Sequence, residues 1–166
     1  HQEKLFNFSK EIIDLLIKYN FTKCYSVKTE IYIDPKIPDI ITSDLSKLRQ
    51  VMINFLTNAY NFTLYGIIKI KVSLIESNED FDEISVSISD TGIGVREDFK
   101  DNLFNTIKTI DDLRLNNRKG TGIGLLICNQ IVERIGMNIC YKRKFKGSKF
   151  SFTFLNVKSN KIKNII

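Results

Sequence analysis

Three short segments of this chain combine residue types that bind polar or charged ligands. They are Asn54-Phe-Leu-Thr-Asn58-Ala-Tyr-Asn61, Asp90-Thr-Gly-Ile-Gly94 and Gly120-Thr-Gly-Ile-Gly-Leu125. Uncharged amides, a carboxylate and a run of glycines offer three different kinds of contact. Together they indicate a site for a ligand that carries both a flat base and charged phosphates.

The asparagines of the first segment fall on one edge of an amphipathic helix. At about 100° per residue, Asn54, Asn58 and Asn61 lie within roughly 60° of one another, beside the apolar face. Such border positions usually carry Lys or Glu, which favour helix more than Asn does. Amide oxygens are neutral, hard ligands that suit Mg²⁺. An Asn-rich composition would also leave Asn at solvated positions, so the helix by itself leaves both readings open.

Asp90 ends a strand in which alternate residues are apolar. Ile84 and Ile88 share one side of this strand, and Asp90 has the same parity. We therefore expect a carboxylate on the core side, where it needs a donor. The exocyclic amine of adenine is such a donor. Gly92 and Gly94 would let a flat ligand approach the backbone, although Asp-Thr-Gly is also an ordinary turn sequence.

The third segment places glycines at the start of a helix expected over Gly122 to Ile135. Free amides at a helix start attract phosphate. The spacing is neither the dinucleotide fingerprint nor a P-loop, whose Gly-Lys-Ser/Thr ending is absent. Glycines also serve close packing, so this segment is informative only beside the other two.

The remaining periodicities predict the elements that position these segments. Expected helices run from a Ser9 cap to about Asn20, from an Asp44 cap to Tyr60, and over 122–135. Expected strands cover 27–33, 67–75, 83–89, 137–144 and 149–157, and the last four form two hairpins. We predict an α+β fold: a two-layer α/β sandwich with a mixed, mostly antiparallel sheet and three helices on one face.

Size and composition favour one ordinary globular domain. The chain has 166 residues, is 43% apolar and carries a net charge of +6. The excess of basic residues comes without interleaved aromatics, so we expect no nucleic-acid partner.

Cys24, Cys128 and Cys140 form no CxxC pair and indicate free thiols in a reducing cytoplasm. Since no apolar run approaches membrane length, any anchor of a parent protein would lie elsewhere.

Taken together, residues 47–63, Asp90–Gly94 and Gly120–Leu125 closely resemble the N, G1 and G2 boxes of sensor histidine kinases. These kinases belong to the GHKL superfamily, whose ATP-binding domains have the Bergerat fold. The resemblance covers Phe8 to Leu155 and implies three parts. These are a linker from a dimerisation hairpin at 1–7, the catalytic domain at 8–157 with an ATP lid at about 101–119, and a tail at 158–166.

The resemblance also implies roles for the residues and two cofactors, ATP and Mg²⁺. Asn58 would ligate Mg²⁺ and Asn54 would support the ion and the phosphates, which makes both catalytic. Asp90 would hold the adenine amine, with Gly92 and Gly94 beneath the ring. The rest of the ATP site would comprise Asn61, Arg118, Lys119, Gly120, Thr121, Gly122, Gly124 and Leu125.

Departures from the family pattern define the expected partners. Asn61 stands where the family usually has Lys, and no Ser-His-Glu-like phosphoacceptor box is present. The acceptor histidine is therefore expected on a dimerisation and phosphoacceptor module of the parent protein. A response-regulator receiver domain is expected downstream, whether or not the parent is a hybrid kinase. The isolated domain is expected to be monomeric.

Phosphoryl transfer to that histidine is the favoured activity, and two alternatives are weighed against it. ATPases of the gyrase, mismatch-repair and chaperone type have a glutamate base where Asn54 stands, and an amide cannot abstract a proton from water. A degenerate kinase-like domain, which binds nucleotide or partners without catalysis, stays open because of Asn61.

Overall fold

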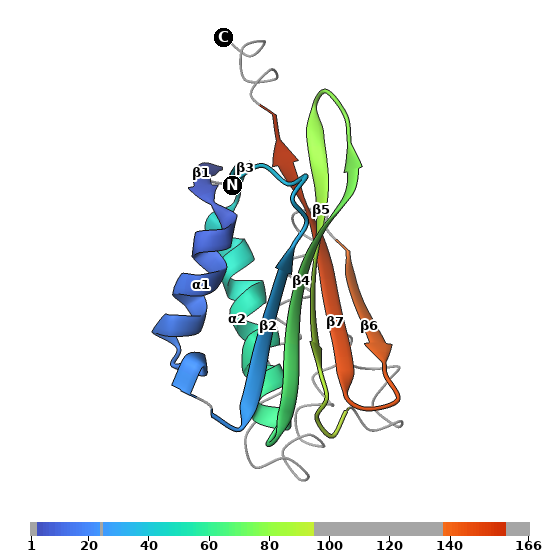
Figure 1. The fold of residues 1–166 in the computed structure, drawn as a ribbon. Coiled ribbons are helices and arrows are strands. Elements are labelled where there is room, and N and C mark those ends of the chain that lie inside the picture. The colour runs from blue at the N-terminus through green and yellow to red at the C-terminus, as the bar shows by residue number, and fades with distance from the viewer. Residues whose placement is uncertain (1–2, 24, 95–137, 159–166) are drawn as a thin grey trace, which may run out of the picture.

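A computed structural model describes residues 3–23, 25–94 and 138–158 (Figure 1). Two α-helices, one short 3₁₀ helix and two sheets form this part of the chain. In chain order the elements are β1 (Lys4–Asn7), α1 (Phe8–Lys18), the short 3₁₀ helix η1 (Phe21–Lys23), β2 (Val27–Ile33), β3 (Ile40–Ser43), α2 (Leu45–Phe62), β4 (Gly66–Ser77), β5 (Phe81–Asp90), β6 (Ile139–Arg143) and β7 (Ser148–Val157).

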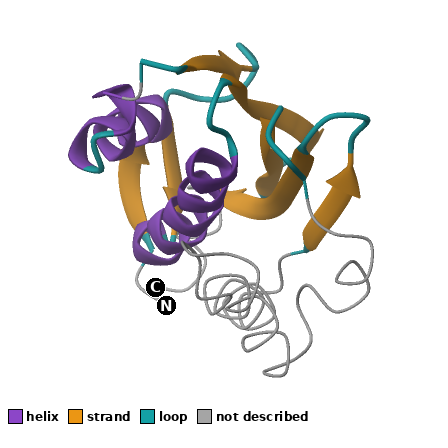
Figure 2. Cartoon of the chain, turned by 90° about the horizontal axis from the view of Figure 1, so that it is seen from below, coloured by secondary structure: helices purple, strands orange, loops and turns teal. Residues whose placement is uncertain are grey.

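The main sheet has five strands in the order β2-β4-β5-β7-β6. β2 and β4 run parallel, whereas the other three neighbouring pairs are antiparallel. A separate two-stranded ribbon pairs β1 with β3. Helices α1 and α2 both lie on one face of the main sheet (Figure 2). The predicted α+β class and the mixed, mostly antiparallel sheet are confirmed; the third expected helix, at 122–135, lies outside the described residues.

The core lies between α2 and the sheet. Alternate residues of β4, β5 and β7 face it, because successive side chains of a strand point to opposite faces. Phe55 of α2 packs its ring against Phe150 and Phe152 of β7, with centroids 5.4 and 5.8 Å apart. The buried residues of α2 are Leu48, Val51, Met52, Phe55, Leu56 and Ala59. The predicted apolar arc of this helix is therefore the face that packs on the sheet.

Capping side chains determine where both helices begin. Asp44 caps α2 as predicted, and its side chain accepts a hydrogen bond from the Lys47 backbone N–H at 3.2 Å. The prediction that Ser9 caps α1 is wrong: the Asn7 side chain accepts from the Lys10 N–H at 2.9 Å, so the helix starts two residues earlier.

The predicted strands are all present among the described residues, with shifts of a few residues at their ends. Two further strands, β1 and β3, were not predicted. Each has four residues, and the pair joins segments more than thirty residues apart in the sequence. Residues 4–7, within the expected linker, thus form a strand of the fold.

Candidate functional site

Asp90 is the last residue of β5 and is buried on the core side of the sheet, with 4% of its surface exposed. Its predicted parity is confirmed, because it pairs with the buried Ile68 of β4. The Gly92 backbone N–H donates to its Oδ1 at 2.9 Å. Burial raises the pKa of this carboxyl, although backbone donors at Gly92 and Ser148 and the charge of Lys144 oppose the rise.

The turn between β6 and β7 lies directly against Asp90. Gly147 has a φ of +84°, and a Cβ atom there would lie 2.0 Å from the Asp90 carbonyl oxygen. Glycine is therefore required both by the backbone conformation and by the close approach. This turn brings the Ser148 N–H to the carboxylate. Gly147, Ser148 and Lys144 thus form part of the surroundings of Asp90, which the sequence-based site did not include.

The turn after Asp90 is fastened to the C-terminal end of α2. The Ile93 N–H donates to the Phe62 carbonyl at 3.1 Å. A Cβ atom at Gly92 would lie 2.2 Å from that same carbonyl oxygen, so only glycine allows this approach. Gly94 has a φ of +75°, in the left-handed region. The buried Thr63 Oγ1 beside this turn lacks a hydrogen-bond partner within the described ranges.

The amide row runs along α2 towards this turn. Asn54, Asn58 and Asn61 are all half-buried, at the border of the face that packs on the sheet. Asn54 and Asn61 are seven positions apart, which corresponds to roughly 10 Å along the helix axis. Asn61 directly precedes Phe62, whose carbonyl holds the turn. The structure therefore joins the first and second predicted segments at one end of the molecule.

An aromatic stack supports the other side of the same helix end. Tyr60 of α2 stacks on Phe21 of η1, with ring centroids 4.4 Å apart and planes 5° from parallel. The Tyr60 hydroxyl also makes a hydrogen bond with the Thr29 hydroxyl of β2. These contacts fix the last turns of α2, which carry Asn58 and Asn61, against the edge of the sheet.

The other predicted residues of the ATP site fall outside the described part of the chain. They are Arg118, Lys119, Gly120, Thr121, Gly122, Gly124 and Leu125, together with the expected lid at about 101–119. Among the described residues, no group of three His, Cys, Asp or Glu side chains gathers in a way that could hold a metal ion. No helix in the described ranges is long and apolar enough to cross a membrane.

Comparison with known proteins assigns the chain to a family. Residues 43–158 match the family described as histidine kinase-, DNA gyrase B-, and HSP90-like ATPase. This match covers most of the chain, which therefore belongs to that family of ATP-binding domains.

Similar proteins within the family are histidine kinases. Hybrid signal transduction histidine kinase B of Dictyostelium discoideum is 35% identical over 124 residues, which are 74% of this chain and 6% of that protein. The sensory/regulatory protein RpfC of Xanthomonas campestris is 35% identical over 118 residues, 70% of this chain and 16% of that protein. This chain thus spans only a small part of the length of both relatives.

Solved structures show the same fold. Full-length ShkA in complex with AMPPNP superposes with a TM-score of 0.74 at 20% identity, over 95% of this chain and 32% of that one. The catalytic domain of histidine kinase ThkA gives a TM-score of 0.71 at 23% identity, over 94% of this chain and 97% of that one. The fold of this chain is that of a histidine kinase catalytic domain.

Proposed function

We propose that this chain is the ATP-binding catalytic domain of a two-component sensor histidine kinase. It transfers the γ-phosphoryl group of ATP to a histidine on a separate dimerisation and phosphoacceptor module of the parent protein. The observation that carries the proposal is the junction of the buried Asp90 with the end of the amide-bearing helix α2, through the Ile93–Phe62 hydrogen bond.

At the base end, Asp90 accepts a hydrogen bond from the exocyclic amine of adenine. Its burial supports this role, because a carboxylate that is poorly solvated gains most from a further donor. Guanine carries a carbonyl oxygen at the equivalent ring position, and two acceptors facing each other would repel. Gly92 and Gly94 keep the backbone beneath the base free of side chains.

At the phosphate end, the amides of α2 hold the triphosphate and its cation. Asn58 is the proposed ligand of Mg²⁺, and Asn54 and Asn61 support the phosphates. Half-buried neutral oxygens fit an ion that keeps several waters and takes few protein ligands. When bound, Mg²⁺ supplies charge neutralisation on the phosphate oxygens. Arg118, Lys119, Gly120, Thr121, Gly122, Gly124 and Leu125 complete this end in the proposal.

The residue types favour a kinase over a hydrolase. Phosphoryl transfer depends mainly on positioning and charge stabilisation, which amides and backbone donors supply. ATP hydrolysis needs in addition a base that activates water, and the amide of Asn54 cannot act as one. The chain's own residues thus bind and orient ATP, whereas any base for the acceptor histidine belongs to the phosphoacceptor module.

The names of the relatives support a place in a phosphorelay. Hybrid kinases such as those named for Dictyostelium discoideum suggest a parent protein with a receiver domain, to which the phosphoryl group then passes. We place the domain in the cytoplasm, with no nucleic-acid partner.

A second candidate function is a degenerate domain that binds nucleotide or protein partners without catalysis. The specific observation in its favour is Asn61, where the family pattern has a lysine. One charge-assisted contact to phosphate contributes about 1.5–3 kcal/mol, so its loss would weaken the site without destroying it.

A phosphorylation assay separates the two candidates. The purified protein, joined to its phosphoacceptor module, is incubated with γ-labelled ATP and Mg²⁺. We expect a labelled product that is acid-labile and alkali-stable, as phosphohistidine is. Nucleotide binding without any such product would support the degenerate domain. Absence of nucleotide binding would overturn the kinase and leave only a degenerate domain that binds protein partners.

A further inference from the structure

A second buried carboxylate, Asp82, lies at the opposite end of β5 from Asp90 and faces the same side of the sheet. The two residues are eight positions apart, which is roughly 27 Å along a strand. Asp82 is 3% exposed, and the proposed nucleotide site does not involve it. A buried charge so far from the site calls for a role of its own.

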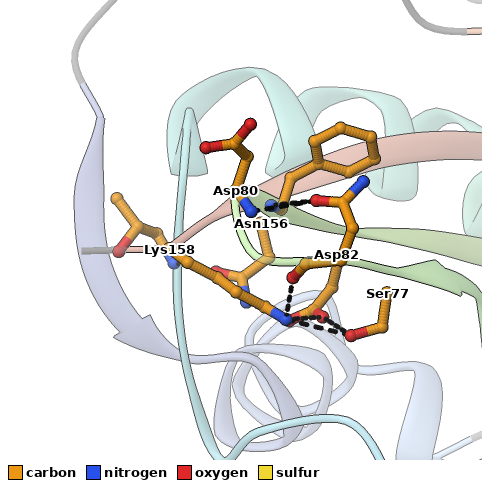
Figure 3. Close-up of polar contacts among 8 residues, drawn as sticks. Ser77, Asp80, Asp82, Asn156 and Lys158 are labelled. Atoms are coloured by element: carbon orange, nitrogen blue, oxygen red, sulfur yellow. Dashed lines mark hydrogen bonds and ion pairs between the residues drawn. The ribbon is translucent and has the colours of Figure 1, made fainter. Parts of the chain in front are cut away.

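Every oxygen of the Asp82 carboxylate has a partner (Figure 3). The Ser77 hydroxyl donates to Oδ1 at 2.7 Å, and Lys158 Nζ lies 2.9 Å from the same oxygen. Asn156 Nδ2 donates to Oδ2 at 2.8 Å. These donors hold the pKa of Asp82 below its ordinary value in spite of burial. The cluster therefore holds a buried carboxylate and a buried amide, Asp82 and Asn156, with the more exposed Ser77 and Lys158 at its outer side.

Asn156 extends this cluster to the second sheet. Its Oδ1 accepts a hydrogen bond from the Thr42 backbone N–H at 2.8 Å, and the amide is buried. Thr42 belongs to β3 and pairs with Leu5 of β1. A continuous chain of contacts thus runs from Asp82 in β5, through Asn156 in β7, to the ribbon formed by β1 and β3.

Apolar side chains also hold the β1–β3 ribbon against the main sheet. Phe6 and Ile41, partners in the ribbon, are both buried. Phe8, just after β1, packs its ring against Phe154 of β7 with centroids 5.3 Å apart. Such packing is non-directional, so by itself it allows small shifts of the ribbon. A buried amide with one partner on each side fixes a single register, at a cost in desolvation.

We propose that Asp82 and Asn156 are positioning residues for phosphoryl transfer, which act by fixing the ribbon, and hence the direction of the chain ahead of β1, relative to the nucleotide site. This inference rests on the proposed function, in which the segment ahead of β1 leads to the phosphoacceptor module. Transfer requires the acceptor nitrogen in line with the γ-phosphorus, and a misplacement of about 1 Å reduces such a rate by on the order of a hundredfold.

Swapping the side chains of Asp82 and Asn156 provides a test of this proposal. Asn156→Asp alone places two carboxylates against each other and breaks the Asp82–Asn156 hydrogen bond. The double variant Asp82→Asn with Asn156→Asp restores one amide and one carboxylate, with the carboxylate now accepting from Thr42. Ser85→Ala, on the opposite face of β5, is the matched control because it removes a polar group outside the cluster.

Three readouts are taken in the kinase that carries its phosphoacceptor module. In Asn156→Asp we expect hydrogen exchange at the Thr42 amide to speed up by at least about tenfold, because its acceptor is displaced. We expect the Kd for ATP to change by less than about twofold, since the site is far away and independent. Transfer to the histidine is expected to slow by about tenfold or more. The double variant should restore both exchange and transfer to near wild-type values.

Two results would overturn the inference while leaving the proposed function intact. One is a wild-type transfer rate in Asn156→Asp despite faster exchange at Thr42. The other is a double variant that protects Thr42 again but still transfers slowly. If Asn156→Asp does not fold, Asn156→Leu is judged by the same criteria, because it removes the acceptor of the Thr42 N–H and approximately keeps the shape. A wild-type protein that binds ATP and transfers nothing would instead contradict the proposed function.

Discussion

Gly147 lies so close to Asp90 that a Cβ atom at position 147 would stand 2.0 Å from the Asp90 carbonyl oxygen and 2.7 Å from its Oδ1. The β6–β7 turn therefore packs directly against Asp90. Asp90 ends β5, and the turn leads into the neighbouring strand β7. The surroundings of Asp90 therefore depend on the register between β5 and β7.

Substitution of this glycine should damage the fold and the site together. We expect Gly147→Ala to lower the free energy of unfolding by about 2 kcal/mol or more, because it combines a positive φ with a backbone clash. Nucleotide affinity should fall as well, since the Ser148 donor shifts with the turn. Urea denaturation and calorimetric titration with ATP measure the two effects.

Gly94→Ala is the matched control for that change. Gly94 also has a positive φ, +75°, but a Cβ atom there would meet its nearest neighbour, the Gly147 carbonyl oxygen, at 3.4 Å. We expect a stability loss of only about 1 kcal/mol, from backbone strain alone. Equal losses in the two variants would contradict the importance of the contact with Asp90.

Asp90→Asn should abolish ATP binding and leave the fold intact. The amide presents a donor where the adenine amine needs an acceptor, whereas loss of the buried charge removes a desolvation cost. Calorimetric titration should show no binding at concentrations that saturate the wild type, with unchanged circular dichroism. An unchanged affinity would refute the role assigned to Asp90.

The same variant gives a pH test with a definite sign. Burial raises the folded-state pKa of Asp90, so the folded protein holds this proton more tightly than the unfolded chain does. As pH falls through the raised pKa towards the ordinary value of about 3.9, the stability of the wild type should therefore rise relative to Asp90→Asn. Urea denaturation of both proteins at several pH values measures this difference, and a difference that falls would contradict the raised pKa.

Asn58→Ala should remove the Mg²⁺ dependence of tight nucleotide binding, because Asn58 is the proposed ligand. Affinity for ATP is measured with Mg²⁺ and with a chelator. In the wild type we expect Mg²⁺ to tighten binding by about tenfold or more, and in the variant by little. Gln50→Ala, at an exposed position earlier on α2, is the control. Equal affinity with and without Mg²⁺ in the wild type would exclude the idea.

Asn61→Lys should tighten ATP binding if the pocket is a kinase site that lacks one charge. A charge-assisted contact to phosphate predicts a gain of about tenfold in affinity. The gain should shrink at high salt, since screening weakens exposed charges. A weaker or unchanged affinity would count against a phosphate contact at this position.

Asp82 should make the fold sensitive to acid. Its folded-state pKa is lowered, so its stabilisation is fully present above the ordinary value of about 3.9 and is lost as pH falls through the lowered pKa. The difference in unfolding free energy between wild type and Asp82→Asn should shrink between about pH 5 and pH 3. A difference independent of pH would show that the charge of Asp82 contributes nothing.

The local patterns of the sequence predicted what depends on one element. Strict alternation in β5 predicted the inward direction of Asp90, and a polar cap before an apolar helix predicted the start of α2 at Asp44. Ser9 misled because Asn7, two residues earlier, is an equally good cap, and the helix that Asn7 caps buries Phe8 in its first turn. Choices of this kind depend on tertiary contacts.

Contacts between distant segments were not predictable in this way. The ribbon of β1 and β3 is too short to show a period, and its pairing links residues far apart. The hairpin of the last two strands was predicted, but the approach of its Gly147 to Asp90 was not, because that approach follows from the strand register. The link from Asn156 to Thr42 likewise joins positions 114 residues apart. No local pattern records such a contact.

The parallel pairing of β2 with β4 has a consequence for how the protein assembles. The chain between these strands contains all of α2, so it must cross over the sheet before β2 can dock at its edge. The antiparallel β4–β5 hairpin closes a far shorter loop and can form early. We therefore expect β5, which carries Asp90, to form before the crossover through α2 is complete, so that Asp90 and the asparagines of α2 come together late in folding.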